Sequence, residues 1–280
     1  MKEAGCALSD SGSINGSLYQ GDGERYVPTV LTTGPWRPDA MHGGAPSALI
    51  GYLITGATED GELVARVQID LEQPVPLEPL LGTVHRRQVS TRVSHLDIEL
   101  RTDTARVVSA KALLMRQEPV ALVAHDQSPT HRPDQFGAMD WSSLYPGGNP
   151  IFVRDAVEHR VVRGGYGVPI PSAAWLRLTV PVVHGHQPCA LSQLLAIADF
   201  GSPLSQTDAI GPGLALINVD VNVTLFREPV GPWFYVDGVG HVGPGGIGLA
   251  VSQLSDYEGM LGVITQSQIA RRYSRNRESH

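Results

Sequence analysis

Short apolar runs, separated by glycine and proline, follow one another along most of the chain. Many of them alternate apolar and polar residues, which places successive side chains on opposite faces of a strand. The pattern predicts strands at residues 25–33, 64–77, 82–102 and 105–116, with the third run broken near residues 89–93. It predicts further strands at residues 156–163, 173–180, 214–226, 233–241, 248–254 and 261–271.

Two segments are mostly apolar without strict alternation. Residues 45–58 read APSALIGYLITGAT, and residues 190–200 read ALSQLLAIADF. A helix that is apolar nearly all round is buried, so each segment is predicted to be a helix packed into the core. Each helix precedes several long strands, which indicates an α+β fold with an antiparallel sheet wrapped around a helix.

The second half of the chain repeats the order of the first. Pro74 marks the end of the first strand after the helix, and Arg116 ends the last strand 42 residues later. In the second half, Arg271 follows Pro229 at the same spacing of 42 residues. Any two α+β halves of this size can look alike, but the matched spacing favours a duplication.

A segment of different character separates the two halves. Residues 118–150 contain five prolines and little periodicity, so they are interpreted as a linker. The predicted organisation is an N-terminal half at 1–117, this linker, and a C-terminal half at 151–280.

Composition narrows the class of protein. The 280 residues carry a net charge of −7, and no Lys/Arg cluster suggests nucleic-acid binding. Two cysteines, Cys6 and Cys189, are too few for a disulfide framework. No secretory signal is visible, and no apolar stretch reaches the roughly 20 residues that span a bilayer. A cytoplasmic protein is expected.

Motifs for metal or covalent chemistry are weak. The one close histidine pair, His184 and His186, has no HExxH motif or cysteine cluster beside it. Cys189 opens the second predicted helix, but no histidine partner is evident. The glycine-rich segment 238–246 lacks the lysine of a phosphate-binding loop. No metal and no cofactor are expected.

Asp199 is the carboxylate that breaks the local pattern. It lies near the end of an apolar helix, where the helix dipole disfavours a negative charge. A residue that breaks a local rule is a candidate functional residue. The alternative is a carboxylate that is simply solvated at the helix end.

Polar residues also interrupt two apolar strands. Asn218, Asp220 and Asn222 are expected to share one face, because they alternate along their strand. Gln266 and Gln268 are expected to share a face of the last strand for the same reason. Either face could instead be the solvent side.

The segment Met41-His42-Gly43-Gly44 enters the first predicted helix. Glycines allow a ligand to approach the backbone, and free N–H groups at a helix start can bind an anion or an oxyanion. A tight turn into a buried helix is the alternative interpretation.

Several of these segments together resemble one family. They are GPWRPDAMHGGAPSALI, QPVPL, ADFGSPLS, INVDVNVTLFREPVGPWF and GPGGIGLAVSQLSDYEGMLGVITQSQIARR. In order and spacing they resemble acyl-CoA thioesterase-like double-hotdog proteins of the thioesterase II type, over roughly residues 25–275. The resemblance implies a double hotdog, with two antiparallel sheets each curled around a helix.

The resemblance also implies a site. The family's catalytic Asp matches Asp199, and its Gln matches Gln266 when the last-strand Arg is placed on Arg271. Its Thr position falls on Asn218 when the strand-ending Arg is placed on Arg227. Asn keeps a donor and an acceptor but lacks the hydroxyl.

The implied activity is hydrolysis of a fatty or related acyl-CoA. Asp199 would activate a water held by Asn218 and Gln266, and the segment His42, Gly43 and Gly44 would bind the substrate and its oxyanion. The resemblance further implies one site per chain and a homodimer. Candidates for the phosphates of CoA are the pairs Arg271–Arg272 and Arg86–Arg87, each of which could equally be solvated.

Two other functional classes are weighed against hydrolysis. A hotdog hydratase or dehydratase would place a His near the catalytic Asp, and none follows Asp199 in FGSPLSQ, which argues against hydration. A non-catalytic acyl-CoA-binding, lipid-binding or structural hotdog protein is favoured by Asn218, since Asn replaces the family's Thr.

Overall fold

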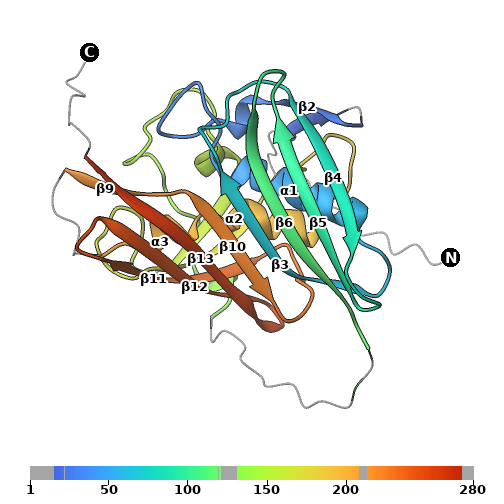
Figure 1. Ribbon diagram of the computed structural model, residues 1–280. Helices are drawn as coiled ribbons and strands as arrows, with labels where there is room; N and C mark the ends of the chain where they lie inside the picture. The colour runs from blue at the N-terminus through green and yellow to red at the C-terminus, as the bar shows by residue number, and fades with distance from the viewer. Residues whose placement is uncertain (1–15, 22, 119, 121–130, 208–212, 273–280) are drawn as a thin grey trace.

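One antiparallel sheet wraps two helices in the computed structural model, which describes residues 16–21, 23–118, 120, 131–207 and 213–272. The helices α1 and α2 lie against the same side of the sheet (Figure 1). The strand order is β1-β2-β4-β5-β6-β3-β10-β13-β12-β11-β8-β7, with β9 paired to β13. The fold is therefore the α+β double hotdog predicted from the sequence.

The first half supplies one long helix and six strands. Its elements are β1 (Tyr19–Gly21), β2 (Arg25–Pro28), η1 (Val30–Thr32), α1 (Gly44–Ala57), β3 (Glu62–Leu71), β4 (Leu80–Gln88), β5 (Val93–Arg101) and β6 (Arg106–Arg116). The predicted break near 89–93 is confirmed, because β4 and β5 pair there as a hairpin. Two predicted strands are shorter in the structure. The 25–33 run becomes a 3-10 turn after Pro28, and β3 stops before Pro74, because proline donates no ladder hydrogen bond.

The second half repeats this order with shorter helices. The 3-10 turn η2 (Pro133–Gln135) lies in the predicted linker. The elements of the second half are η3 (Phe152–Ala156), β7 (Val157–Arg163), β8 (Ala173–Leu178), α2 (Ala190–Ala198), α3 (Gly201–Leu204), β9 (Leu214–Asn218), β10 (Asp220–Leu225), β11 (Phe234–Val242), β12 (Ile247–Asp256) and β13 (Gly259–Arg272). The predicted strand at 214–226 is divided at Val219 into β9 and β10.

The two predicted sheets are joined into one. Strand β3 of the first half pairs with β10 of the second, with Val67 opposite Val223 in the register. The pairing of β3 with β10 is the seam between the two hotdog sheets, and its backbone hydrogen bonds make them one continuous sheet.

The helices of the two halves pack tightly against each other. A methyl group added at Gly51 of α1 would lie 2.6 Å from the Cα of Ser192 in α2. At Gly44 the same atom would meet the carbonyl oxygen of Ala196. Because glycine has no Cβ, it permits this approach, which brings the start of α1 close to the end of α2.

Apolar side chains of both helices and of the inner sheet face form a common core. Leu49 and Ile50 of α1 and Leu194 and Leu195 of α2 are fully buried, as the apolar character of these segments predicts. Among the described residues, no helix is both long enough and apolar enough to span a membrane.

Candidate active site

Asp199 lies where the two halves meet. It is the C-terminal cap of α2, and Phe200 alone separates it from the first residue of the short helix α3. Its side chain is 8% exposed, so the carboxylate depends on protein partners rather than on bulk water. The start of α1 and the strands β9 and β13 supply those partners.

The three residues predicted to form the site converge. Asn218 Nδ2 donates a hydrogen bond of 2.8 Å to Oδ1 of Asp199. Gln266 is fully buried, and its Nε2 lies 3.4 Å from the same Oδ1 and 3.4 Å from the backbone oxygen of Asp199. Two amide donors therefore hold one carboxylate oxygen, and Oδ2 is left for other contacts.

The predicted common face of Asn218, Asp220 and Asn222 is wrong for Asn218, whereas Asp220 and Asn222 do share a face, where Asn222 Nδ2 donates to Asp220 Oδ2. Asn218 is opposite Gln268, whereas Asn222 is opposite Thr265, so four residues on one strand match three on the other. This irregularity at Val219 turns the strand over, as a bulge does. Asn218 points inward to Asp199, while Asp220 binds the N–H and hydroxyl of Ser267. The other predicted face is confirmed, since Gln266 and Gln268 are both buried.

His42 is the residue that approaches Oδ2. Its Nδ1 lies 3.3 Å from Asp199 Oδ2, and the side chain is 10% exposed. The imidazole is stacked against both Phe152 and Phe200, with ring centroids 4.8 Å and 5.1 Å away. Burial lowers the pKa of His42 below its usual value, although the charge of Asp199 opposes this shift. The ring is accordingly neutral at pH 7.

This contact corrects one inference from the sequence. The segment FGSPLSQ directly after Asp199 contains no histidine, yet a histidine of the other half lies beside Asp199 in space. The absence of a His after Asp199 is therefore no argument against hydratase or dehydratase chemistry. The contact was missed because residues 42 and 199 belong to different halves, and no sequence spacing relates them.

The two glycines of the predicted oxyanion site differ. The N–H of Gly44 donates to His42 Nδ1 at 3.0 Å, so this donor is already engaged. The N–H of Gly43 donates no hydrogen bond within the described residues. A methyl group added at Gly43 would lie 2.7 Å from Asp199 Oδ2, so the backbone here is in close contact with the carboxylate.

A second buried polar pair extends the site and was not predicted. Gln268 Nε2 donates to Ser202 Oγ at 2.7 Å, and both residues are almost fully buried. The signal was present in the sequence, because Gln268 lies two residues after Gln266 on the same strand face, and Ser202 lies one helical turn after Asp199. The side-chain oxygens of both glutamines have no hydrogen-bond partner among the described residues.

The candidate arginines for phosphate binding are not equivalent. Arg86 is bound to Glu62 and to the carbonyl oxygen of Ala57, so it is already paired within the first half. Arg87 contacts His95. Arg271 and Arg272 are exposed near the end of β13. No group of His, Cys, Asp and Glu side chains in the described part of the chain could hold a metal ion.

Three solved structures show the same fold at low sequence identity. Acyl-CoA thioesterase II TesB2 from Mycobacterium marinum has 13% identity and a TM-score of 0.62, covering 91% of this chain and 96% of that one. The tesB protein of Mycobacterium avium subs paratuberculosis has 17% identity and a TM-score of 0.62, covering 90% and 95%. A hot dog protein of unknown function from Alicyclobacillus acidocaldarius has 13% identity and a TM-score of 0.64, covering 91% and 96%.

Sequence comparison gives the family. No curated protein matches the sequence. A model of the acyl-CoA thioesterase N-terminal domain matches residues 32–116. A model of the acyl-CoA thioesterase C-terminal domain matches residues 125–270, which is more than half of the chain. The chain therefore belongs to the acyl-CoA thioesterase family, with one domain model of that family matching each half.

Proposed function

We propose that the protein hydrolyses an acyl-CoA thioester to the free acid and CoA, with Asp199 as the general base. The observation that carries this proposal is the buried carboxylate held by Asn218 and Gln266 on one oxygen and facing His42 with the other. A carboxylate in such a setting can take a proton from a water that attacks the thioester carbonyl. The amides of Asn218 and Gln266 fix its direction.

The tetrahedral intermediate needs a donor for its oxyanion. We assign this role to the N–H of Gly43, because the N–H of Gly44 is occupied by His42. A single such donor typically contributes about 10²–10³ in turnover. The thiolate of CoA is a good leaving group, so the water can attack directly and no covalent enzyme intermediate is needed.

His42 is suited to accept the proton that Asp199 takes from the water. Because Nδ1 accepts the Gly44 N–H, the imidazole proton is assigned to Nε2. Nδ1 then carries no proton, so it can form a hydrogen bond with Oδ2 of Asp199 only after the carboxylate has taken up a proton. A proton taken up at Oδ2 has this nitrogen as its nearest acceptor, at 3.3 Å.

Release of free thiol from a panel of acyl-CoAs tests the proposal. The wild type should release thiol, and Asp199→Asn should not, because an amide cannot accept the proton. The substitution keeps the size of the side chain, and circular dichroism and thermal melting check the fold. Thiol release by Asp199→Asn at the wild-type rate would disprove the assignment. Light scattering on the same samples tests the homodimer that we expect.

Reversible addition of water to an enoyl thioester is a second candidate, favoured by the contact between His42 and Asp199. A neutral imidazole beside a carboxylate can exchange the proton that this reaction moves. Loss of enoyl absorbance without thiol release would identify this activity, and thiol release without loss of the enoyl group would exclude it. Acyl-CoA binding with neither reaction would favour a non-catalytic module.

A further inference from the structure

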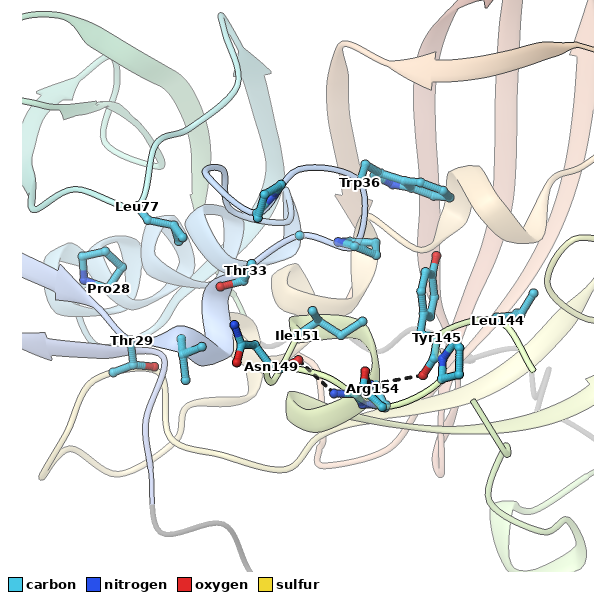
Figure 2. A pocket seen from close by; sticks show the side chains of 16 residues that line it. Pro28, Thr29, Thr33, Trp36, Leu77, Leu144, Tyr145, Asn149, Ile151 and Arg154 are labelled. Atoms are coloured by element: carbon cyan, nitrogen blue, oxygen red, sulfur yellow. Dashed lines mark hydrogen bonds between the residues drawn. The ribbon is translucent and has the colours of Figure 1, made fainter. Parts of the chain in front are cut away.

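The two oxygens of Asp199 have different surroundings. On the Oδ2 side, His42 stacks on Phe152, and the N–H of Phe152 donates to the carbonyl oxygen of Thr33. Thr33 lines an open cleft of about 720 Å³ (Figure 2). Within the described residues, no lining residue of this cleft forms a hydrogen bond with Asp199. The cleft therefore does not hold the carboxylate, and the hydrogen bonds that do are on the Oδ1 side.

The place of Asp199 depends on the short helix α3, which begins two residues later. A helix of four residues has too few backbone hydrogen bonds to fix its own position, so the surface beneath it decides that position. A methyl group at Gly238 of β11 would lie 2.6 Å from Oγ of Ser205, the C-terminal cap of α3, and one at Gly240 would overlap the carbonyl oxygen of Ser205. The end of α3 thus rests directly on the backbone of β11.

A side chain of β13 holds the beginning of α3. Gln268 Nε2 donates to Ser202 Oγ over 2.7 Å, and both residues are almost fully buried. Gln266 reaches Asp199 itself only at 3.4 Å, which is beyond the usual length of an N–H···O hydrogen bond. Among the described side chains of β13, the short hydrogen bond to this turn is therefore made by Gln268, three residues after the carboxylate.

The amide of Gln268 is devoted to this contact. Its Oε1 has no hydrogen-bond partner in the described part of the chain, so Ser202 is what keeps a buried amide in place here. Loss of either partner would leave the other buried without a hydrogen bond, which is unfavourable. An amide and a hydroxyl carry no charge, so the pair can fix the turn without altering the electrostatic field at Asp199.

We infer that Gln268 and Ser202 are positioning residues, which hold the turn between α2 and α3 so that Asp199 Oδ1 meets Asn218. The inference rests on the proposed function for its effect on turnover. Asn218 belongs to β9, and its Nδ2 lies 2.8 Å from Oδ1, so a shift of the turn by about 1 Å would break this hydrogen bond. A misplacement of that size can cost about 100-fold in rate.

A double-mutant cycle tests the pair in the full-length protein. Ser202→Ala and Gln268→Met each remove one partner, and the double variant removes both. Each single variant should lower kcat for thiol release about 10- to 100-fold and leave KM within about twofold. The double variant should be no slower than the slower single variant, because both residues act through one hydrogen bond. The acidic limb of the pH profile should not move, because the pair carries no charge.

Circular dichroism and urea unfolding check that each variant is folded. Ser202→Ala is the milder change, because alanine favours a helix, and it carries the test alone should Gln268→Met not fold. Ser192→Ala is the matched control. Ser192 is a buried serine near the start of α2, where its hydroxyl bonds to Cys189, and its removal should leave kcat unchanged.

Three kinetic outcomes would overturn the inference. The first is a wild-type kcat in folded Ser202→Ala. The second is an equal loss of kcat in Ser192→Ala, which would indicate a general loosening of the helices. The third is a pair of effects that simply multiply in the double variant, because independent residues do not share one contact.

A crystal structure of Ser202→Ala, compared with the wild type in the same crystal form, separates this inference from the proposed function. The distance between Asp199 Oδ1 and Asn218 Nδ2 should rise above about 3.5 Å in the variant. An unchanged distance of 2.8 Å would overturn the inference even in a protein that hydrolyses thioesters. A displaced carboxylate in a protein that hydrolyses no thioester would support the positioning role while disproving the proposed function.

Discussion

Replacing Asn218 by aspartate tests whether Asp199 needs an uncharged hydrogen-bond donor at this position to act as the base. The wild-type Nδ2 donates to Asp199 Oδ1 over 2.8 Å, and Asn218→Asp would set a second carboxylate at that distance. Two unit charges so close repel by about 6 kcal/mol at an effective dielectric constant of about 20. The half-buried side chain can turn towards solvent, which relieves part of this repulsion. The two carboxylates should therefore share one proton at a pH at which a lone carboxylate is ionised.

The assay is thiol release from the best acyl-CoA over a range of pH. Since the base must be unprotonated, the acidic limb of kcat/KM should move upward by about 1–3 pH units in Asn218→Asp. Asn218→Thr is the matched control, because Thr keeps a hydrogen-bond donor without adding a charge. It should leave the acidic limb unchanged. An acidic limb of Asn218→Asp that coincides with the wild type, or an equal shift in Asn218→Thr, would refute the reasoning.

Three further predictions follow from the same contacts. Gly43→Ala should lower kcat about tenfold or more, because its methyl group would lie 2.7 Å from Asp199 Oδ2. Gly56→Ala is the control and should leave kcat unchanged, because its methyl group would meet nothing within 4 Å. An equal kcat for the two variants would contradict the close contact at Gly43. His42→Gln should lower kcat about 10- to 100-fold through loss of the acceptor for the proton taken up at Oδ2, and an unchanged kcat would exclude that role. Burial lowers the pKa of His159 to about 3, so the folded state binds this proton less readily than the unfolded chain. The free energy of unfolding, measured with urea, should therefore be highest above pH 6.5 and fall by about 2–3 kcal/mol at pH 4.5. His159→Gln should flatten this pH dependence, and an unaltered slope in the variant would contradict the prediction.

Most of the fold could be predicted because local pattern and tertiary structure agree. The alternating run that became β5 buries Leu96, Ile98 and Leu100, as a half-buried strand requires. The apolar segment that became α1 is buried along most of its length. Local pattern cannot show which strands pair between the halves, and the seam of β3 and β10 was not expected for that reason.

The residues of the candidate site were likewise predictable where the local pattern marks them, and unpredictable where their contacts depend on tertiary packing. Asp199 and Gln266 stood out because each is polar within an apolar element, and the structure brings them together. The division of the predicted strand at Val219 could not be predicted, because a single irregular residue reverses the strand face without any change in the alternating sequence pattern. The contact of His42 with Asp199 depends on how α1 meets α2, which packing alone determines.

The continuous sheet has a consequence for the independence of the two halves. Separating them would expose the backbone edges of β3 and β10, each of which has a neighbouring strand on both sides in the intact chain. Open strand edges of apolar sequence are templates for aggregation. Each half expressed alone should therefore be insoluble, whereas the two halves produced together should reassociate along this edge. Such fragment complementation would restore activity only when the edge closes, because His42 and Asp199 come from opposite fragments.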